Sequence, residues 1–197
     1  RPTGLEVSGE EIGILKTPSK WSKISLVRVA MGHDVAVTAI QMLNVLCCIG
    51  NDGVFMKPHL VQKVVDKDGV ILLENKPETL SQPITARTAE QMRLMLSEVT
   101  REGGTGTRGA VPGYNVAGKT GTAEKIVDGH YTANENIASF MGLLPAARPE
   151  IGIIVVLDNP QPMRTGSMSA APVFAQIAAA VASHLDIPTA RTSDYRP

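Results

Sequence analysis

Hydrophobic and polar positions along the chain follow a helical period in three places. Residues 35–49 are apolar except for three polar side chains spaced three apart: Thr38, Gln41 and Asn44. This pattern predicts a nearly buried helix, which the turn sequence at 50–53 would stop. Residues 85–102 repeat apolar side chains at spacings of three and four until a pair of glycines ends the run. Residues 169–185 form the third helical pattern.

The third helix carries its own boundary signals. Ser169 is a candidate N-cap, and Pro172 falls within the first turn, where proline is tolerated. We expect one apolar face to pack against the rest of the protein. The residues predicted on that face are Phe174, Ile177, Val181 and Leu185.

Between the helical patterns the chain changes to the chemistry of strands. Residues 54–74 contain two apolar runs around a sequence that ends in Asp-Gly, which is a hairpin turn signal. Residues 137–144 and 151–157 are apolar strands joined by a short loop, and residues 114–123 can pair with them. The last helix is then free to cover this sheet. The sequence therefore predicts an α+β fold, an antiparallel sheet with covering helices.

Composition narrows the classes of function. With 197 residues and 43% hydrophobic content, the chain can form a packed domain or a large piece of one. Lys+Arg and Asp+Glu both number 19, and no basic stretch is interleaved with aromatic residues, so no nucleic-acid partner is expected. Cys47 and Cys48 are adjacent, which disfavours a disulfide between them. The four histidines lack metal-ligand spacing, and we expect no metal or other cofactor.

The start of the chain predicts an excerpt from a longer polypeptide. It begins with Arg1 and shows no charged leader followed by an apolar segment. The longest apolar stretch, 35–49, is too short to span a bilayer. A membrane anchor, if the parent protein has one, is therefore expected outside these residues.

The stretch GYNVAGKTGTAEK, residues 113–125, satisfies two motifs with different chemistry. One is G-x-x-x-x-G-K-[ST], a phosphate-binding loop, and the other is K-T-G at residues 119–121. A phosphate loop requires a buried strand before it and a helix that starts at its lysine. Here a glycine-rich loop precedes the motif, and glycines at 121 and 129 weaken any helix after it. Nucleotide binding is therefore the disfavoured alternative, although Asp158 ends an apolar strand as a magnesium-binding aspartate would.

The K-T-G interpretation requires residues 114–123 to form a strand that borders a cleft. In such a strand Lys119 would supply a positive charge for an anionic substrate group, and Thr120 and Thr122 could donate hydrogen bonds to its carboxylate. Gly121 would let ligand and backbone approach closely. An N–H at an exposed strand edge can stabilise an oxyanion by about 3 kcal/mol.

The segment GGTGTRGAVPGYNVAGKTGTAEK resembles the corresponding part of class B penicillin-binding proteins, the monofunctional peptidoglycan D,D-transpeptidases of bacteria. Further stretches are similar to that family in the same order: TGLEVSGEEIG, PSKWSKISLVRVAMGHDVAVTAIQM, NDGVFMKPHLV and SAAPVFAQIAAAVASHL. The similarity runs from about Thr3 to about Pro188, and it is greatest to the division-type enzymes. It implies that residues 1–188 are the C-terminal part of a transpeptidase domain with the fold of serine β-lactamases, and that residues 189–197 are a tail.

The resemblance also implies a reaction and roles for residues. The family transfers an acyl group from a D-alanyl-D-alanine stem peptide through a serine ester, and β-lactams trap that ester. Lys119 would shape the electrostatics of the cleft, Thr120 and Thr122 would bind the carboxylate, and the Thr122 N–H would be an oxyanion donor. Gly121 would keep the strand edge clear, and Tyr131, expected in the loop after the strand, would help to wall the cleft. The parent would be anchored in the bacterial inner membrane with this domain outside the cytoplasm, and division or elongation proteins are possible partners.

Two family motifs are absent from the sequence. None of its serines has a lysine three positions on, and S-x-N does not occur, so we expect the chain to hold the K-T-G half of an active site and to be inactive alone. The family sheet has five strands, two of them from preceding residues, so an open sheet edge and marginal stability are expected. A non-catalytic peptide-binding relative and a serine β-lactamase are the remaining alternatives.

Overall fold

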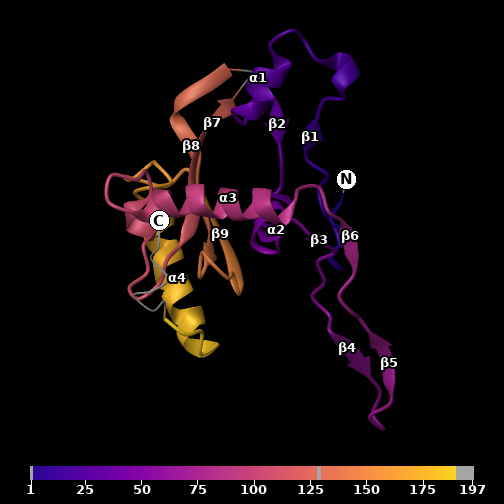
Figure 1. The fold of residues 1–197 in the computed structure, drawn as a ribbon. Helices are drawn as coiled ribbons and strands as arrows, with labels where there is room; N and C mark the ends of the chain where they lie inside the picture. Colours follow the sequence, from indigo (N-terminus) through magenta and orange to yellow (C-terminus); the bar gives the residue numbers. More distant parts are fainter. Residues whose placement is uncertain (1, 128–129, 190–197) are drawn as a thin grey trace. The chain divides into compact units, whose positions relative to one another are not determined.

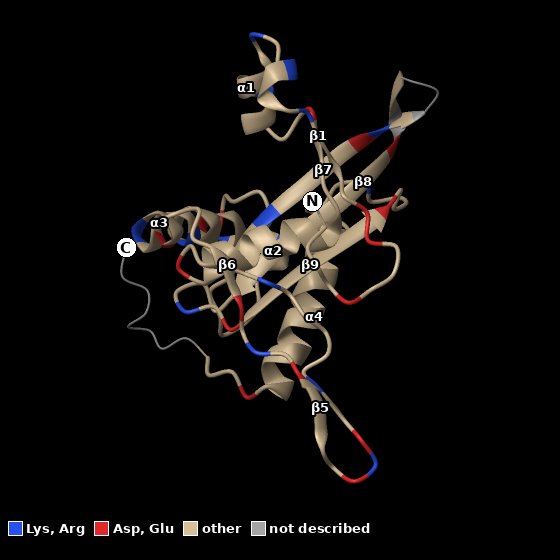
Figure 2. Ribbon diagram, turned by 90° about the vertical axis from the view of Figure 1, so that its right-hand side faces the viewer, with Lys and Arg blue, Asp and Glu red and all other residues tan. Residues whose placement is uncertain are grey.

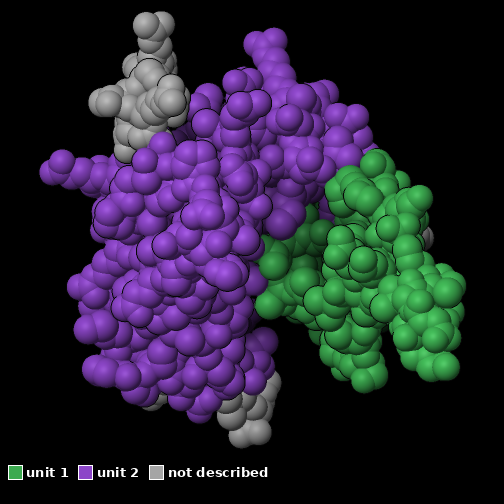
Figure 3. Space-filling model, turned by 90° about the horizontal axis from the view of Figure 1, so that it is seen from below, with its two compact units in different colours: residues 1–44, 56–80 green, residues 45–55, 81–197 purple. Residues whose placement is uncertain are grey.

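The computed structural model describes residues 2–127 and 130–189, and within the predicted tail it describes only Thr189. The described chain forms two compact units. The first comprises Arg1–Asn44 and Met56–Leu80, and the second comprises Val45–Phe55 and Ser81–Pro197 (Figure 3). The predicted α+β architecture is confirmed, because antiparallel strands and helices occur together.

Short strands and helices make up the first unit. Strand β1 (Ile14–Leu15) pairs antiparallel with β2 (Val35–Ala36), and η1 (Pro18–Lys20) and α1 (Ser25–Ala30) lie between them in the chain. The hairpin predicted within 54–74 is present as β4 (Lys63–Val65) and β5 (Ile71–Glu74) (Figure 1). Two further short strands, β3 (Phe55–Met56) and β6 (Thr79–Ser81), pair with each other.

One glutamate holds the base of the β4–β5 hairpin. The Leu60 N–H donates to Glu6 Oε2 at 2.9 Å, and Asn75 Nδ2 donates to Glu6 Oε1 at 3.1 Å. The same Asn75 nitrogen also donates to the Val61 carbonyl at 2.7 Å. Residues before and after the hairpin are thus joined to the N-terminal segment.

The first predicted helix begins later than the sequence pattern suggested. Helix α2 spans Ala39–Gly50, whereas residues 35–36 are strand β2, so the predicted start at residue 35 is wrong. The reason is a capping box: the Gln41 N–H donates to Thr38 Oγ1 at 3.2 Å, and the Thr38 N–H donates to Gln41 Oε1 at 2.9 Å. These bonds satisfy N–H groups that the helix itself leaves free, and so fix its start.

A three-stranded antiparallel sheet is the centre of the second unit. Its strands are β7 (Ala117–Val127), β8 (His130–Leu144) and β9 (Ile151–Asp158), in the order β7-β8-β9. Thr120 is opposite Phe140, which is in turn opposite Val155. The predicted strands are confirmed, but their bounds differ. The strand predicted at 114–123 begins three residues later, at Ala117. The strand predicted from 137 already begins at His130, because β7 and β8 stay paired as one long hairpin.

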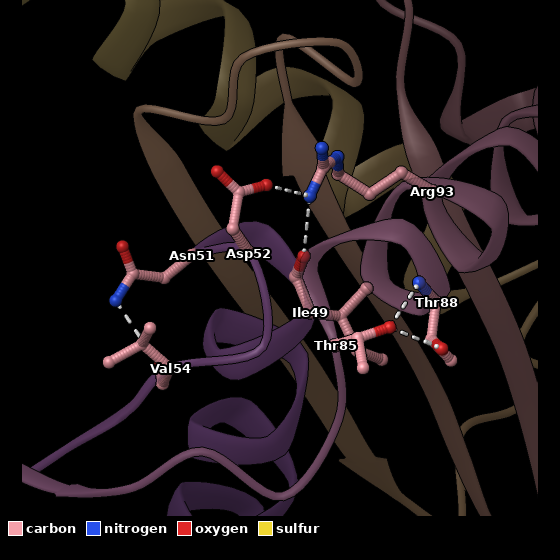
Figure 4. Close-up of polar contacts among 7 residues, drawn as sticks. All are labelled: Ile49, Asn51, Asp52, Val54, Thr85, Thr88 and Arg93. Atoms are coloured by element: carbon pink, nitrogen blue, oxygen red, sulfur yellow. Dashed lines mark hydrogen bonds and ion pairs between the residues drawn. The ribbon is translucent and has the colours of Figure 1, made fainter.

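Helices α3 and α4 flank this sheet. Helix α3 (Ala86–Ser97) is capped by Thr85, whose Oγ1 accepts the Thr88 N–H at 3.1 Å (Figure 4). It contacts β7 and is followed by η2 (Glu98–Thr100) and η3 (Thr107–Gly109). Helix α4 (Ala170–His184) contacts β8 and β9. The helices predicted from Thr85 and at 169–185 are therefore confirmed.

The predicted buried face of α4 is only partly right. Phe174 is fully buried, but Ile177 is 40% exposed and Leu185 is 54% exposed. The buried positions are instead mostly alanines: Ala170, Ala171, Ala178 and Ala182. Small side chains let the helix approach the sheet closely, so the large apolar residues are displaced to its flank. The predicted Ser169 side-chain cap is also wrong, because Ser169 Oγ donates to the Thr165 carbonyl at 2.8 Å instead.

Phe140 lies at the centre of the core. Its ring packs against Phe174 with centroids 4.7 Å apart and planes tilted by 54°. A Cβ atom at Gly106, Gly109 or Gly118 would lie 2.5–2.7 Å from an atom of the Phe140 ring. The three glycines therefore form a glycine cage around this ring, in which a side chain would overlap it.

Candidate functional site

The K-T-G sequence lies inside a strand. Lys119, Thr120 and Gly121 occupy the first half of β7, and no helix starts at the lysine. This geometry excludes the phosphate-loop interpretation, which needs a helix N-terminus at that position. Asp158, the candidate magnesium ligand of that interpretation, instead accepts a 2.8 Å hydrogen bond from Lys125 Nζ.

Side chains of the motif alternate between the two faces of the sheet. Thr120 and Thr122 share the face of Phe140, toward which α4 packs, because Thr120 is opposite Phe140 and Thr122 is opposite Ala138. Lys119 and Gly121 belong to the other face, opposite Met141 and Ser139. The predicted site residues 119–122 therefore share one strand, but their side chains do not all lie on one face of the sheet.

β7 has one open edge. Its partner is β8, and the described residues contain no strand on its other side. In an antiparallel pair, alternate residues direct their N–H and C=O groups away from the partner. The Thr120 carbonyl accepts from Lys119 Nζ at 2.6 Å, and the Val116 carbonyl accepts from Thr100 Oγ1 at 3.0 Å, so these groups are on the open side. The same alternation directs the Thr122 N–H toward the open edge.

Lys119 is an exposed cation at this edge. Among residues 2–127 and 130–189, no carboxylate forms an ion pair with it. Its hydrogen bond to the neighbouring Thr120 carbonyl keeps the ammonium group beside the backbone of β7. The charge is available to an anionic ligand that approaches the edge.

Two loops abut the threonines on the Phe140 face. A Cβ at Gly106, which precedes η3, would lie 3.2 Å from Thr120 Cγ2. Gly166, in the segment between β9 and α4, donates its N–H to Thr122 Oγ1 at 3.2 Å. We call residues 159–169 the Gly166 loop. Sequence reasoning missed both glycines, because each contact joins segments that no local pattern connects.

Gly121 has a second neighbour that the sequence did not predict. A Cβ at this position would overlap Ser139 Oγ on the adjacent strand. The absence of a side chain at Gly121 therefore makes room for Ser139, a reason for glycine that is separate from the predicted access of a ligand.

The structure moves Tyr131 away from the expected loop. Tyr131 belongs to β8, where it is opposite Ile126, and it is 65% exposed. The predicted loop position is therefore wrong, because the β7–β8 hairpin remains paired past this residue. Ile126 is four residues beyond Thr122, about 13 Å along an extended strand. The structure does not bring Tyr131 together with the K-T-G residues.

Charged residues hold the outer half of the β7–β8 hairpin (Figure 2). Lys125 Nζ lies 2.8 Å from Asp158 Oδ1 and 3.7 Å from Glu135 Oε2. The hydrogen bond to Asp158 raises the pKa of the Lys125 ammonium group above its ordinary value. The Lys125 charge is thus used in ion pairs within the sheet, whereas the Lys119 charge of the K-T-G motif has no carboxylate partner among the described residues.

The described residues offer few alternatives to this edge as a reactive site. They contain no group of three or more His, Cys, Asp or Glu side chains that could hold a metal ion. Burial raises the pKa of the Cys47 and Cys48 thiols, which keeps them protonated and poorly nucleophilic near neutral pH. No helix in the described part of the chain has the length and apolar character needed to cross a membrane.

The open edge of β7 thus combines a cation, two hydroxyls and an outward N–H within four consecutive residues. A carboxylate can accept from the hydroxyls and pair with the cation, and a developing oxyanion can accept from the N–H. These groups have the chemistry that an acyl-transfer substrate requires, but they do not include a nucleophile with its base.

Comparison with known proteins gives a consistent result. Residues 1–179 match the family described as "Penicillin binding protein transpeptidase domain". The chain is 34% identical over 177 residues to stage V sporulation protein D of Bacillus subtilis, covering 89% of this chain and 27% of that protein. It is 31% identical over 170 residues to the probable peptidoglycan D,D-transpeptidase PenA of Neisseria flavescens, covering 86% of this chain and 40% of that protein.

A solved structure shares the fold. The chain aligns with penicillin-binding protein 3 of Mycobacterium tuberculosis in complex with aztreonam, with a TM-score of 0.87 and 32% sequence identity. The alignment covers 96% of this chain and 44% of that one. The present chain therefore spans less than half the length of each of these three proteins.

Proposed function

This chain belongs to the class B penicillin-binding protein transpeptidases, and from that premise we propose that it forms the K-T-G half of a peptidoglycan D,D-transpeptidase active site. The observation that carries the proposal is the open edge of β7, where Lys119 and the outward Thr122 N–H are three residues apart on one strand. The PenA relative is named a probable peptidoglycan D,D-transpeptidase, which supports the same reaction for the parent protein.

In the proposed reaction a serine hydroxyl attacks the carbonyl carbon of the penultimate D-alanine of a stem peptide. The carbonyl oxygen becomes an oxyanion, the C–N bond breaks, and terminal D-alanine leaves after its nitrogen gains a proton. An amine of a second stem peptide then attacks the ester, releases the serine and forms the cross-link. A β-lactam follows the first step, but its opened ring remains on the serine.

The residues of the motif divide the work of binding and charge stabilisation in this proposal. The Thr122 N–H donates to the oxyanion, and Lys119 stabilises negative charge in the cleft. The hydroxyls of Thr120 and Thr122 donate to the terminal carboxylate of the peptide or drug, and Gly121 keeps the strand edge accessible. Tyr131 would contact only those ligand groups that extend outward along the hairpin.

The serine and its base come from polypeptide outside these residues in this proposal. The sequence contains neither S-x-x-K nor S-x-N, although both belong to the family's reaction. The partners are then the remainder of the same protein, stem peptides that end in D-alanyl-D-alanine, and β-lactams. The parent would reside in the bacterial inner membrane with this domain on the periplasmic side, where division or elongation proteins could bind it.

The test is intact mass spectrometry after incubation with benzylpenicillin. The 197-residue chain and the full-length gene product are treated side by side, and peptide mapping locates any adduct. We expect the mass of one drug molecule on the full-length protein, at a serine of an S-x-x-K sequence, and none on the 197-residue chain. Because ring opening expels no leaving group, the entire drug mass should be retained.

Three results would contradict the proposal. An adduct on a serine of the 197-residue chain would mean that the chain has its own activated nucleophile. A full-length protein that remains unmodified while it still binds stem peptide would be a non-catalytic binding module. Rapid loss of the adduct together with drug hydrolysis would instead identify a β-lactamase.

A further inference from the structure

The Gly166 loop donates a hydrogen bond to the candidate site at Thr122. Its Gly166 N–H donates to Thr122 Oγ1 at 3.2 Å across 44 residues of sequence. The loop can lie this close because Gly166 has no side chain: a Cβ there would overlap the carbonyl oxygens of Gly121 and Ser139. The contact therefore depends on glycine at this position.

This hydrogen bond determines what the Thr122 hydroxyl can do. A hydroxyl has one proton to donate and two lone pairs that accept. A backbone N–H can only donate, so the Gly166 N–H occupies a lone pair and leaves the Thr122 proton for another acceptor. An ionised carboxylate is such a group, because it can only accept. Polarisation by the N–H also makes the hydroxyl a better donor.

We infer that the Gly166 N–H is a positioning group that keeps the Thr122 hydroxyl ready to donate to a ligand carboxylate at the open edge of β7. The inference rests on the proposed function and assigns a role to a residue that does not itself reach the ligand. Gly166 acts through Thr122, so it is a positioning residue and Thr122 is the binding residue.

A second contact ties the same loop to the neighbourhood of Thr120. Met163 Sδ lies 3.9 Å from Arg108 Nη1, and Arg108 belongs to η3, which follows Gly106 beside Thr120. The Gly166 loop thus connects with the segments behind both threonines. A displacement of the loop from β7 would break the hydrogen bond from the Gly166 N–H to Thr122 Oγ1 while the strand itself stays in place.

The test measures the preference of the full-length protein for a carboxylate. Acylation rates are measured with benzylpenicillin and with its methyl ester, which cannot accept as an anion. We expect Gly166→Ala to lower the rate with the acid about tenfold and the rate with the ester less than twofold. Gly166→Ala thus lowers the ratio of the rate with the acid to the rate with the ester. Thr122→Val should lower this acid-to-ester ratio at least as much, whereas Thr122→Ser, which keeps the hydroxyl, should retain most of the wild-type ratio.

A matched control separates this effect from a general loss of packing. A Cβ at Gly53 would overlap the Ile84 carbonyl oxygen. This is a backbone clash like the one at Gly166, but at a position without contact to Thr122. Gly53→Ala should destabilise the protein but leave the acid-to-ester ratio unchanged. The double variant Gly166→Ala with Thr122→Val should have the ratio of Thr122→Val alone, since both changes remove one interaction.

The outcomes distinguish this inference from the proposed function. A wild-type protein that benzylpenicillin does not acylate would overturn the proposed function and the inference with it. A wild-type protein that is acylated, but in which Gly166→Ala slows acid and ester equally, would leave the proposed function intact and reduce Gly166 to a structural role. Additive losses in the double variant would also overturn the inference.

Discussion

Arg93 in α3 and Asp52 after α2 form an ion pair in which Nη1 lies 3.0 Å from Oδ1 (Figure 4). The same nitrogen donates to the Ile49 carbonyl at 2.8 Å. That carbonyl belongs to the last turn of α2, where the helix provides no partner for its oxygen. The Arg93 side chain is only 10% exposed, whereas that of Asp52 is 66% exposed. Arg93 therefore caps the end of one helix from the side of another.

We expect Arg93→Met to lower the free energy of unfolding by about 2 kcal/mol, because the partly buried Ile49 carbonyl then loses its charged donor. Asp52→Asn should cost less than about 1 kcal/mol, since the aspartate is largely solvated. Urea unfolding of both variants measures the difference. Arg101→Met removes an exposed pair with Glu98 and is the matched control. Equal losses for Arg93→Met and Asp52→Asn would show that the ion pair, rather than the helix cap, provides the stability.

Lys119 offers a direct test of the site. In the full-length protein, Lys119→Met should slow acylation by benzylpenicillin at least 100-fold, because a positive charge next to the oxyanion and carboxylate is lost. The thermal unfolding temperature should change little, since the lysine is exposed at an open edge. Lys125→Met is the matched control on the same strand: it breaks the pair with Asp158 and should leave the acylation rate within twofold. A normal rate for Lys119→Met would remove the motif from the proposed active site.

Thr120 tests the assignment of the second hydroxyl. Thr120→Val keeps the shape of the side chain and the contact with Gly106, but it removes the hydroxyl. We expect its acylation rate with benzylpenicillin to fall about tenfold and its rate with the methyl ester to remain nearly unchanged. If both rates were preserved, Thr122 alone would bind the carboxylate.

Glu6 predicts a pH dependence at the base of the β4–β5 hairpin. The hydrogen bond from the Leu60 N–H lowers the pKa of the Glu6 carboxyl below its ordinary value of 4.5. A lowered pKa means that folding favours the charged form, so the stabilisation is present above pH 4.5 and is lost as the pH falls through the lower folded pKa. Amide hydrogen exchange should show protection of Leu60 at pH 6 that disappears toward pH 3.

Two variants make the Glu6 prediction specific. Glu6→Gln should remove the pH dependence of Leu60 protection in this range, because the amide does not titrate. Glu10→Gln alters a different carboxyl, which accepts from the Thr3 N–H, and should leave Leu60 unaffected. Protection that still falls with pH in Glu6→Gln would assign the titration to another group.

Local patterns predicted the elements whose cause is local. The Asp-Gly turn between β4 and β5 and the glycines after the α3 region are examples. The start of α2 was missed although Thr38 and Gln41 carry a capping signal, because the apolar residues at 35–37 continued the helical pattern. The buried face of α4 was misjudged because large side chains were expected inside, whereas close contact with the sheet requires alanine.

In the candidate site, too, features with a local cause were predicted and features that depend on distant segments were not. Lys119 to Thr122 are consecutive, so their sequence alone indicated a strand with the right chemistry. The position of Tyr131 depended on how far β7 and β8 stay paired, which is a property of two strands together. The contact between Gly166 and Thr122 could not be predicted, because it arises only when the chain after β9 returns over the sheet.

The glycine cage around Phe140 has a consequence for how this sequence can evolve. Gly118→Ala alone should destabilise the protein by about 2 kcal/mol through overlap with the ring, and Phe140→Leu should cost a similar amount through lost packing. Combined, they should cost less than their sum, because the smaller side chain relieves the overlap. We therefore expect Phe140→Leu to suppress part of the cost of alanine substitutions at 106, 109 and 118. The size of one ring then limits which side chains all three positions can accept.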